Sequence, residues 1–362
     1  MYIYENKDFP NFVYDKDKIF DLLAKVKAKQ AYLLGKMDML GFEVKEKAML
    51  NVLTEEVIKS SEIEGEILDP KQARSSIARR LGMHSGGNIN IERNVEGIVD
   101  MMLDAMQNPS KEMTHERLYG WQSAMFPGGF SGLYRIKIGA YRDDSNGPMQ
   151  VVSGAMGKEK VHYEAPKAES LETLMSELID YINNSNDDCI LKSGIVHLWF
   201  VIIHPFDDGN GRIARALSDM LLARCENSPN QFYSMSSQIK NVRKSYYEAL
   251  EITGSATLNI TSWLIWFLET LIMAIENSGE LLKSVLQKAE FWQRHQNTPL
   301  NERQIKVLNR VLDDFKGNLT TTKWAKMTNS SQDTAARDIQ DLINKGILTK
   351  HGEARATHYL LT

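Results

Sequence analysis

Apolar residues recur three and four positions apart along most of this 362-residue chain, which is the spacing of helices with one buried face. The first such stretch runs from Lys16 to Met39, with Ile19, Leu22 and Val26 on one side. The same spacing predicts further helices over residues 43–68, 71–81, 91–106 and 113–126, and from 170 to about 288. The predicted fold is therefore mainly α-helical.

The helical spacing lapses between Gly132 and Tyr163, where β-like runs appear. Residues 149–154 and 160–163 are short segments of this kind, and glycines stand at positions 154 and 157. Strand-like runs separated by glycines favour a β-hairpin. From the residues alone, an ordinary surface hairpin is the simplest interpretation.

The last sixty residues show a different pattern. Three short helical stretches follow Asn301, and two β-like runs then flank Gly352, an order that resembles a winged helix-turn-helix. The segment 297–301, which contains Pro299, is the predicted linker before it. The predicted domains are an N-terminal helical segment over residues 1–85, a central core over 86–295 and a winged helix over 300–362.

The candidate recognition helix of that module offers more acid than base, with Asp333, Arg337, Asp338 and Asp341. DNA binding depends on the neutralisation of phosphates by Lys and Arg. Residues 300–362 hold 10 basic and 7 acidic side chains, a modest excess. DNA binding, protein binding and dimerisation all stay open for this module.

Composition excludes some classes of protein. The 43 Lys and Arg residues against 47 Asp and Glu give no global field for nucleic acid or membrane. The most apolar long run, 260–275, contains Glu269 and is shorter than the ~20 residues that span a bilayer. Cys189 and Cys225 form no metal or redox motif, which predicts two free thiols in a reducing compartment. We therefore expect a soluble, cytoplasmic protein.

The segment with the most chemical information is 204–215, His-Pro-Phe-Asp-Asp-Gly-Asn-Gly-Arg-Ile-Ala-Arg. An apolar run precedes it and a helical pattern follows it, so it is predicted to be a loop that leads into a helix N-terminus. Glycine amides at such a terminus bind anions. Arg212 and Arg215 share one helical face, which favours a polyphosphate ligand.

Two further side chains in this segment suit phosphate chemistry. Asp208 is a candidate magnesium ligand, and His204 carries a side chain that titrates near neutral pH. A base, an anion site, a metal carboxylate and two guanidiniums are what transfer from a nucleotide phosphate to a hydroxyl requires. A polar loop that merely caps two core helices is the alternative, and four such features within twelve residues argue against it.

These twelve residues resemble the signature of the Fic family, His-x-Phe-x-(Asp/Glu)-Gly-Asn-Gly-Arg-x-x-Arg, at every defined position. Enzymes of that family typically move AMP from ATP to a Ser, Thr or Tyr hydroxyl of a protein. The resemblance implies that His204 is the general base, Phe206 anchors the loop and Asp208 binds Mg²⁺. It assigns the α- and β-phosphates to Gly209, Asn210 and Gly211, the β-phosphate also to Arg212, and the γ-phosphate to Arg215.

The same resemblance implies an all-helical core with one β-hairpin, the flap, which holds a target segment by backbone pairing. Here the flap residues are Val151, Val152, Ser153 and Gly154. The helical segment after the motif resembles the family's helix beside the nucleotide base, which makes Tyr246 and Tyr247 candidate ATP contacts. Adjacent helical tyrosines are more often packing residues, so both interpretations stay open.

An inhibitory segment is also predicted. Residues 60–65 read Ser-Ser-Glu-Ile-Glu-Gly, with Ser60 and Glu64 four apart on a predicted helix. They resemble the family's motif (Ser/Thr)-x-x-x-Glu-(Gly/Asn), which in its second class precedes the core. The resemblance implies that Glu64, supported by Ser60, pairs with Arg215. Glu62 and Glu66 compete by composition, but only Glu64 fits the full pattern.

The sequence thus predicts a protein adenylyltransferase that uses ATP and Mg²⁺ and is autoinhibited by Glu64. Phosphoryl or other nucleotide-derived group transfer, or removal of AMP, on the same site is one alternative. A nucleotide-sensing DNA-binding regulator is another. The expected partners are a target protein, with self-modification and a homodimer left open, and no membrane.

Overall fold

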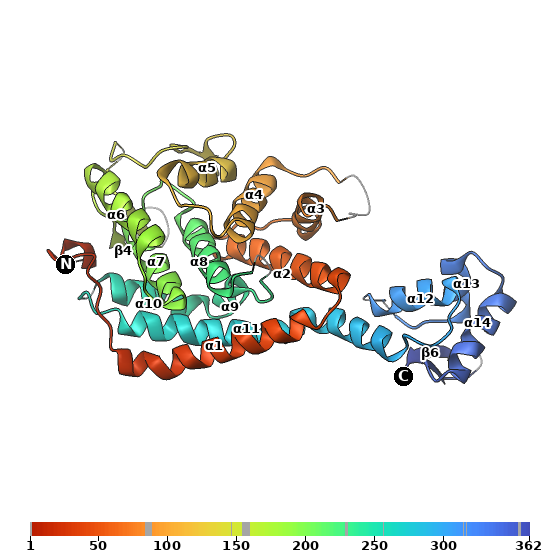
Figure 1. Cartoon of the computed structure of the whole chain (residues 1–362). Helices are drawn as coiled ribbons and strands as arrows, with labels where there is room; N and C mark the ends of the chain where they lie inside the picture. Colours follow the sequence, from red (N-terminus) through yellow and green to blue (C-terminus); the bar gives the residue numbers. More distant parts are fainter. Residues whose placement is uncertain are drawn as a thin grey trace. The chain divides into compact units, whose positions relative to one another are not determined.

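The computed structural model describes residues 2–83, 89–145, 147–153, 160–228, 231–255, 257–313, 315, 317–353 and 356–362, with the side chains at 280, 281 and 284 set aside. By its internal contacts the chain divides into two compact units (Figure 1). Unit 1 comprises residues 1–41 and 45–279, and unit 2 comprises 42–44 and 280–362.

Unit 1 is mainly helical, as the periodicity predicts. Its elements, in chain order, are η1 (Ile3–Glu5), α1 (Lys16–Asp38), α2 (Phe42–Ile63), α3 (Pro70–Arg80), α4 (Arg93–Gln107), α5 (His115–Met125), β1 (Phe130–Ser131), β2 (Tyr134–Arg135), β3 (Gln150–Ser153), β4 (Lys160–Glu164), η2 (Ala168–Ser170), α6 (Leu171–Asn184), α7 (Cys189–Ile203), α8 (Asn210–Glu226), α9 (Met235–Asn241), α10 (Arg243–Gly254) and the first part of α11 (Thr261–Arg294).

The helix predicted over residues 43–68 is shorter in the structure. It ends at Ile63, and Glu64 is its C-cap. Gly65 follows with a φ of 88°, a left-handed conformation that glycine adopts without steric cost. The next helix then begins at Pro70, where the fixed φ of proline suits a first helical position and Asp69 caps the end. Glu64 thus stands on the turn that ends the helix rather than within it.

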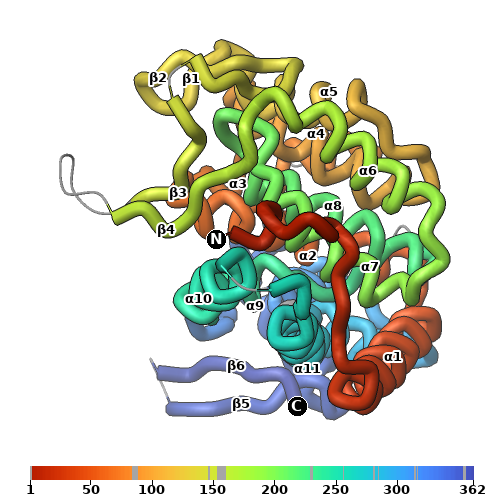
Figure 2. The backbone as a smooth tube through the Cα atoms, turned by 90° about the vertical axis from the view of Figure 1, so that its left-hand side faces the viewer, coloured from red at the N-terminus to blue at the C-terminus, as the bar shows by residue number. Residues whose placement is uncertain are grey.

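The centre of unit 1 is the packed pair α7 and α8, which lie beside each other in Figures 1 and 2. All but two side chains of α7 are buried, so the helix is apolar all round. Gly194 lets α11 approach, since a Cβ there would stand only 2.9 Å from a ring carbon of Phe267. Trp263 of α11 donates a hydrogen bond of 2.8 Å to the carbonyl of Gly194. This packing fixes both helices that flank the 204–215 segment.

The prediction of two free thiols is wrong for this structure, in which a disulfide joins Cys189 and Cys225. Cys189 is the first residue of α7 and Cys225 lies in the last turn of α8. Because α7 and α8 pack antiparallel and are joined by one loop, these two residues, 36 apart in sequence, approach to a Cα–Cα distance of 5.4 Å. The bond ties the ends of α7 and α8 that are remote from the 204–215 loop.

A buried pair of acids lies between α2 and α8. Glu56 and Asp219 are fully buried, and Glu56 accepts hydrogen bonds from the Ser234 hydroxyl (2.7 Å) and the Ser236 amide (3.0 Å). Burial, with the neighbouring Glu56 carboxylate, raises the pKa of Asp219 well above its ordinary value, although Arg215 acts in the opposite direction. Asp219 is therefore protonated more readily in the folded protein than a solvent-exposed carboxyl would be.

This pair predicts a pH-dependent stability. Because the pKa of Asp219 is raised on folding, its stabilising contribution is complete at acidic pH and is lost as the pH rises through the folded-state pKa. Asp219→Asn removes that loss. The melting temperature of the variant should therefore rise relative to that of wild type as the pH increases from 5 to 8, by on the order of 2–4 °C. Scanning calorimetry at several pH values measures the difference. The exposed Asp21→Asn is the control, and a gain that does not grow with pH would contradict the raised pKa of Asp219.

Unit 2 contains the end of α11, then α12 (Glu302–Leu312), α13 (Thr321–Thr328), α14 (Gln332–Asn344), β5 (Leu348–His351) and β6 (His358–Leu361). The two strands pair antiparallel, and Leu319 forms an isolated bridge to Tyr359. Trp324, Ile339 and Leu342 lie in the core that the three helices share with the strands. The order of helices and strands matches the pattern predicted from sequence.

None of the helices that the structure describes is both long and apolar enough to cross a membrane.

Candidate functional site

The 204–215 segment is a tight loop between α7 and α8. His204 ends α7 with a φ of 49°, and Gly209 precedes α8 with a φ of 89°. The Asn210 side chain closes the loop, because its Oδ1 accepts from the Phe206 amide (3.0 Å) and its Nδ2 donates to the Phe206 carbonyl (2.7 Å). The Phe206 ring is fully buried and contacts Tyr141. Phe206 and Asn210 thus hold the loop rigidly to the core.

His204 lies where a buried helix meets this loop. Burial lowers the pKa of its imidazole to about 4, the positive charge of Arg142 contributes, and the backbone of Val201 partly offsets the shift. Arg142 also donates a hydrogen bond of 2.9 Å to the carbonyl of His204. An imidazole with so low a pKa is neutral at pH 7 and is able to accept a proton.

Arg215, one turn into α8, is bound to the end of α2. Its Nε donates to the Ser60 hydroxyl and one Nη to the Ser60 carbonyl, both at 2.9 Å. The same Nη forms an ion pair of 2.8 Å with Glu64 Oε1. Only 1% of the Arg215 side chain is exposed, so solvent screens this pair weakly. The structure therefore brings together Ser60, Glu64 and Arg215, which the sequence pattern selects.

The carboxylate of Glu64 also covers the N-terminus of α8. A Cβ placed on Gly211 would overlap the Glu64 carboxylate, so only glycine leaves the space that this carboxylate fills. Free amides and the helix dipole make this position favourable for an anion. In the structure an internal carboxylate occupies the place that a phosphate group suits.

Arg212 contacts a carboxylate that the sequence pattern did not select. Its Nη1 forms an ion pair with Glu66, which stands two residues beyond Glu64. The guanidinium also lies over the Phe126 ring, 5.0 Å from the centroid. Its Nε is buried and meets no acceptor in the described part of the chain. This unsatisfied donor fits a site built to receive a further anion.

Asp208 is the candidate metal ligand in the loop. Its Oδ2 accepts a hydrogen bond from the Ser131 hydroxyl of β1, and its Oδ1 lies 3.9 Å from Arg212 Nη2. No group of three or more acidic, His or Cys side chains suited to a metal occurs among the described residues. Mg²⁺ commonly uses one or two protein carboxylates, with substrate phosphates and water as its other ligands. The half-exposed Asp208 beside the anion site fits that pattern.

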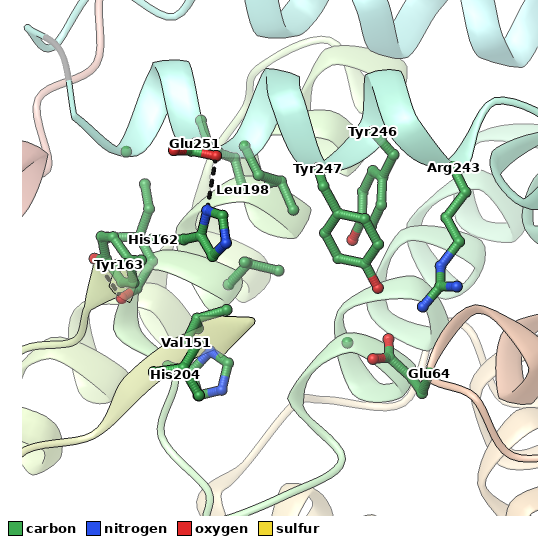
Figure 3. A pocket seen from close by; sticks show the side chains of 16 residues that line it. Glu64, Val151, His162, Tyr163, Leu198, His204, Arg243, Tyr246, Tyr247 and Glu251 are labelled. Atoms are coloured by element: carbon green, nitrogen blue, oxygen red, sulfur yellow. Dashed lines mark hydrogen bonds and ion pairs between the residues drawn. The ribbon is translucent and has the colours of Figure 1, made fainter. Parts of the chain in front are cut away.

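A cavity of about 490 Å³ adjoins the loop. His204, Gly211 and Glu64 line one part of it, and side chains of α7, the flap and α10 line the rest (Figure 3). Tyr246 is buried and donates or accepts a hydrogen bond of 2.9 Å with His197, while Tyr247 is partly exposed and points toward Glu64 (Figure 3). Tyr246 is thus mainly a packing residue, and Tyr247 presents its ring to the cavity.

The predicted flap is the pair β3 and β4, at the edge of the helical body in Figure 2. The strands are antiparallel, with Val151 opposite Tyr163 and Ser153 opposite Lys160. Val151 and Val152 line the cavity. Gly154 lies outside the described residues. The hairpin therefore borders the same cavity as His204.

Sequence reasoning missed several residues at this site. Ser131 donates a hydrogen bond to Asp208, and Arg142 donates one to the carbonyl of His204. Asn94 donates one to Glu66, the partner of Arg212. None of them lies in a local motif, since each reaches the loop from another element. For Glu66 the sequence does contain one signal. It is an acid two positions after Glu64, and the glycine between them lets the chain turn.

Two family models match parts of this chain. The family model described as the Fic/DOC family matches residues 112–222, and a domain of unknown function, DUF4172, matches residues 2–83. The protein adenylyltransferase fic-1 of Caenorhabditis briggsae is 36% identical over 53 residues, 14% of this chain and 10% of that protein. A probable protein adenylyltransferase of Aquifex aeolicus is 34% identical over 61 residues, 17% of this chain and 19% of that protein. The matches thus span a fifth or less of these curated relatives.

Solved structures share the fold over a larger part of the chain. A Fic family protein from Desulfovibrio desulfuricans G20 aligns with a TM-score of 0.57 and 18% identity, covering 95% of this chain and 96% of that one. A Fic domain-containing signalling protein from Bacteroides thetaiotaomicron aligns with a TM-score of 0.51 and 20% identity, covering 74% and 98%. At these identities the likeness concerns the fold. The solved structures therefore show the fold, and the family model shows a similarity to the Fic/DOC family over residues 112–222.

Proposed function

We propose that this protein is a protein adenylyltransferase that transfers AMP from ATP to a hydroxyl of a protein. One observation carries the proposal: a buried, neutral His204 lines the same cavity as the glycine-bounded N-terminus of α8. That terminus carries Arg212 and Arg215, two guanidiniums suited to a phosphate chain. The names of the matched relatives support the same chemistry.

In the proposed reaction the amides at the start of α8 bind the phosphate chain, with Arg212 at the β-phosphate and Arg215 at the γ-phosphate. His204 removes the proton of the target hydroxyl, whose oxygen attacks the α-phosphorus. The bond between the α-phosphorus and the bridging oxygen breaks, and pyrophosphate leaves. A magnesium ion held by Asp208 would neutralise charge on the phosphates. Tight burial of both arginines keeps these interactions strong.

The flap supplies the proposed path for the target. An extended segment that pairs with an exposed strand edge gains backbone hydrogen bonds without a demand on its sequence. The strands β3 and β4 border the cavity, and Val151 and Val152 face it. A segment laid along this hairpin would bring a Ser, Thr or Tyr hydroxyl near His204.

Glu64 is proposed to be inhibitory in this resting structure. Its ion pair with Arg215 removes the partner proposed for the γ-phosphate, and its carboxylate covers Gly211. A triphosphate that binds beside Glu64 would be displaced from the position needed for in-line attack. Movement of Glu64 is therefore a step before productive ATP binding. In this proposal the helix α2 belongs to the active site as much as to the fold.

The proposal is tested with ATP labelled separately on the α- and γ-phosphates. Transfer of α-label to protein, with release of pyrophosphate, is the expected result. Transfer of γ-label instead would show phosphoryl transfer and overturn the assignment. Loss of α-label from premodified protein would reveal removal of AMP by the same site.

We further propose that residues 300–362 form a winged helix, with DNA binding as a second candidate function. The observation that favours it is that Asp338 pairs with Arg303 at 2.7 Å and Asp341 with Lys345. Two of the three acids counted against DNA binding are thus engaged within the module, while Arg337 is exposed. A mobility shift with random duplex DNA should weaken steeply with salt if this is right. The absence of a shift at low salt would exclude it.

A further inference from the structure

The turn after α2 presents two carboxylates to two different arginines. Gly65 stands between Glu64 and Glu66 with a φ of 88°, so the chain reverses between them. The Glu66 amide donates to the Ser61 carbonyl at 3.0 Å, which fixes that reversal. Glu64 reaches Arg215, and Glu66 reaches Arg212. A continued helix would have carried the second carboxylate away from α8.

Glu66 is held in place from a third element. Its Oε1 accepts a hydrogen bond of 3.1 Å from Asn94 of α4, while its Oε2 contacts Arg212. Its side chain is 34% exposed, whereas that of Arg212 is 5% exposed. Asp208, the other acid beside Arg212, lies farther away at 3.9 Å. Glu66 is therefore the main counter-charge of Arg212.

We propose that Glu66 is a second internal phosphate mimic, which limits the number of phosphates that the resting site accepts. This rests on the proposed function, in which Arg212 takes the β-phosphate and Arg215 the γ-phosphate. While Glu66 pairs with Arg212 and Glu64 pairs with Arg215, neither arginine is available to its phosphate group. The resting protein then binds a nucleoside monophosphate in preference to the diphosphate or the triphosphate. Glu66 selects at the β-phosphate and Glu64 at the γ-phosphate.

The test compares the affinities of AMP, ADP and ATP for the full-length protein by isothermal titration calorimetry in magnesium-containing buffer. Glu66→Ala should raise the affinity for ADP relative to AMP by about tenfold, the value of one charge-assisted contact of about 1.4 kcal/mol. Glu64→Ala should instead raise the affinity for ATP relative to that for ADP. The double variant should show both changes.

Two further variants make the test specific. Glu62→Gln is the matched control, because Glu62 lies on the same turn but pairs with Lys59 and Lys240, and its ratios should equal those of wild type. Asn94→Ala leaves both carboxylates in the chain but removes the support of Glu66, so it should shift the ADP-to-AMP ratio in the same direction and by less.

The outcomes separate this inference from the proposed function. If no variant binds any of the three nucleotides, the proposed function itself fails. If nucleotides bind and α-label is transferred, but neither Glu66→Ala nor Asn94→Ala changes the ADP-to-AMP ratio, the role of Glu66 is overturned. A changed ratio in Glu62→Gln as well would reduce the effect to general charge removal and would also overturn it.

Discussion

His204→Ala should lower transfer of AMP by about 100-fold or more, the usual contribution of a positioned general base. The imidazole is buried and neutral, with a pKa lowered to about 4, so it is ready to take the hydroxyl proton at any pH near neutrality. The measurement is incorporation of α-labelled ATP into protein with the Glu64→Gly change in the background, so that the starting rate is high. ATP binding by the same variant should persist.

The same histidine predicts the acid limb of the pH profile. Because the neutral form acts as the base and burial lowers its pKa, transfer should be lost only as the pH falls toward 4, not near 6.5. A profile that falls near 6.5, or an alanine variant with wild-type transfer, would remove His204 from its proposed role. The retained binding of ATP distinguishes lost chemistry from a lost fold.

Glu64→Gly should raise transfer of AMP by about tenfold or more, since loss of one charge-assisted contact of about 1.4 kcal/mol changes an equilibrium tenfold. The substitution frees Arg215 and uncovers Gly211, while Ser60 still orients the guanidinium. Glycine is compatible with the turn, because the Glu64 backbone is a helix C-cap. Initial rates with α-labelled ATP measure the change.

Glu62→Gly is the control for this increase, because it places a glycine two residues earlier, in the last turn of α2, and removes a carboxylate that contacts lysines instead. Its rate should stay at or below that of wild type. Equal activation by both variants would indicate loosening of the end of α2 rather than release of Arg215. No activation by Glu64→Gly would show that its ion pair is structural and not inhibitory.

The loop at 204–215 was predictable from sequence because its chemistry is local. An apolar helix before it, two glycines within it and two arginines three apart after it all act over one or two turns. The structure keeps those relations, with Asn210 closing the loop on Phe206 and Gly209 in a left-handed conformation. The Glu64–Arg215 contact spans 151 positions and was reached only through a resemblance, since helical spacing alone specifies no distant partner.

The errors have physical causes of the same kind. The helix at 43–68 was predicted too long because apolar periodicity continues past Ile63, whereas the left-handed Gly65 ends it. Two cysteines 36 residues apart carry no pairing signal, yet the antiparallel packing of α7 and α8 brings them together. The partner of Asp338 is Arg303, which lies 35 positions away, so no local pattern indicates their ion pair.

By itself, the sequence determined a mainly helical chain, a loop that suits a phosphate chain beside a histidine, and a separate C-terminal pattern of three helices and two strands. These follow from periodicity and from side chains only a few residues apart. Only the tertiary structure decided that Glu66 meets Arg212, that Ser131 meets Asp208 and that Asp219 is buried beside Glu56. Each of those contacts joins separate elements, and its partner is selected by how helices pack in space, which no local pattern encodes.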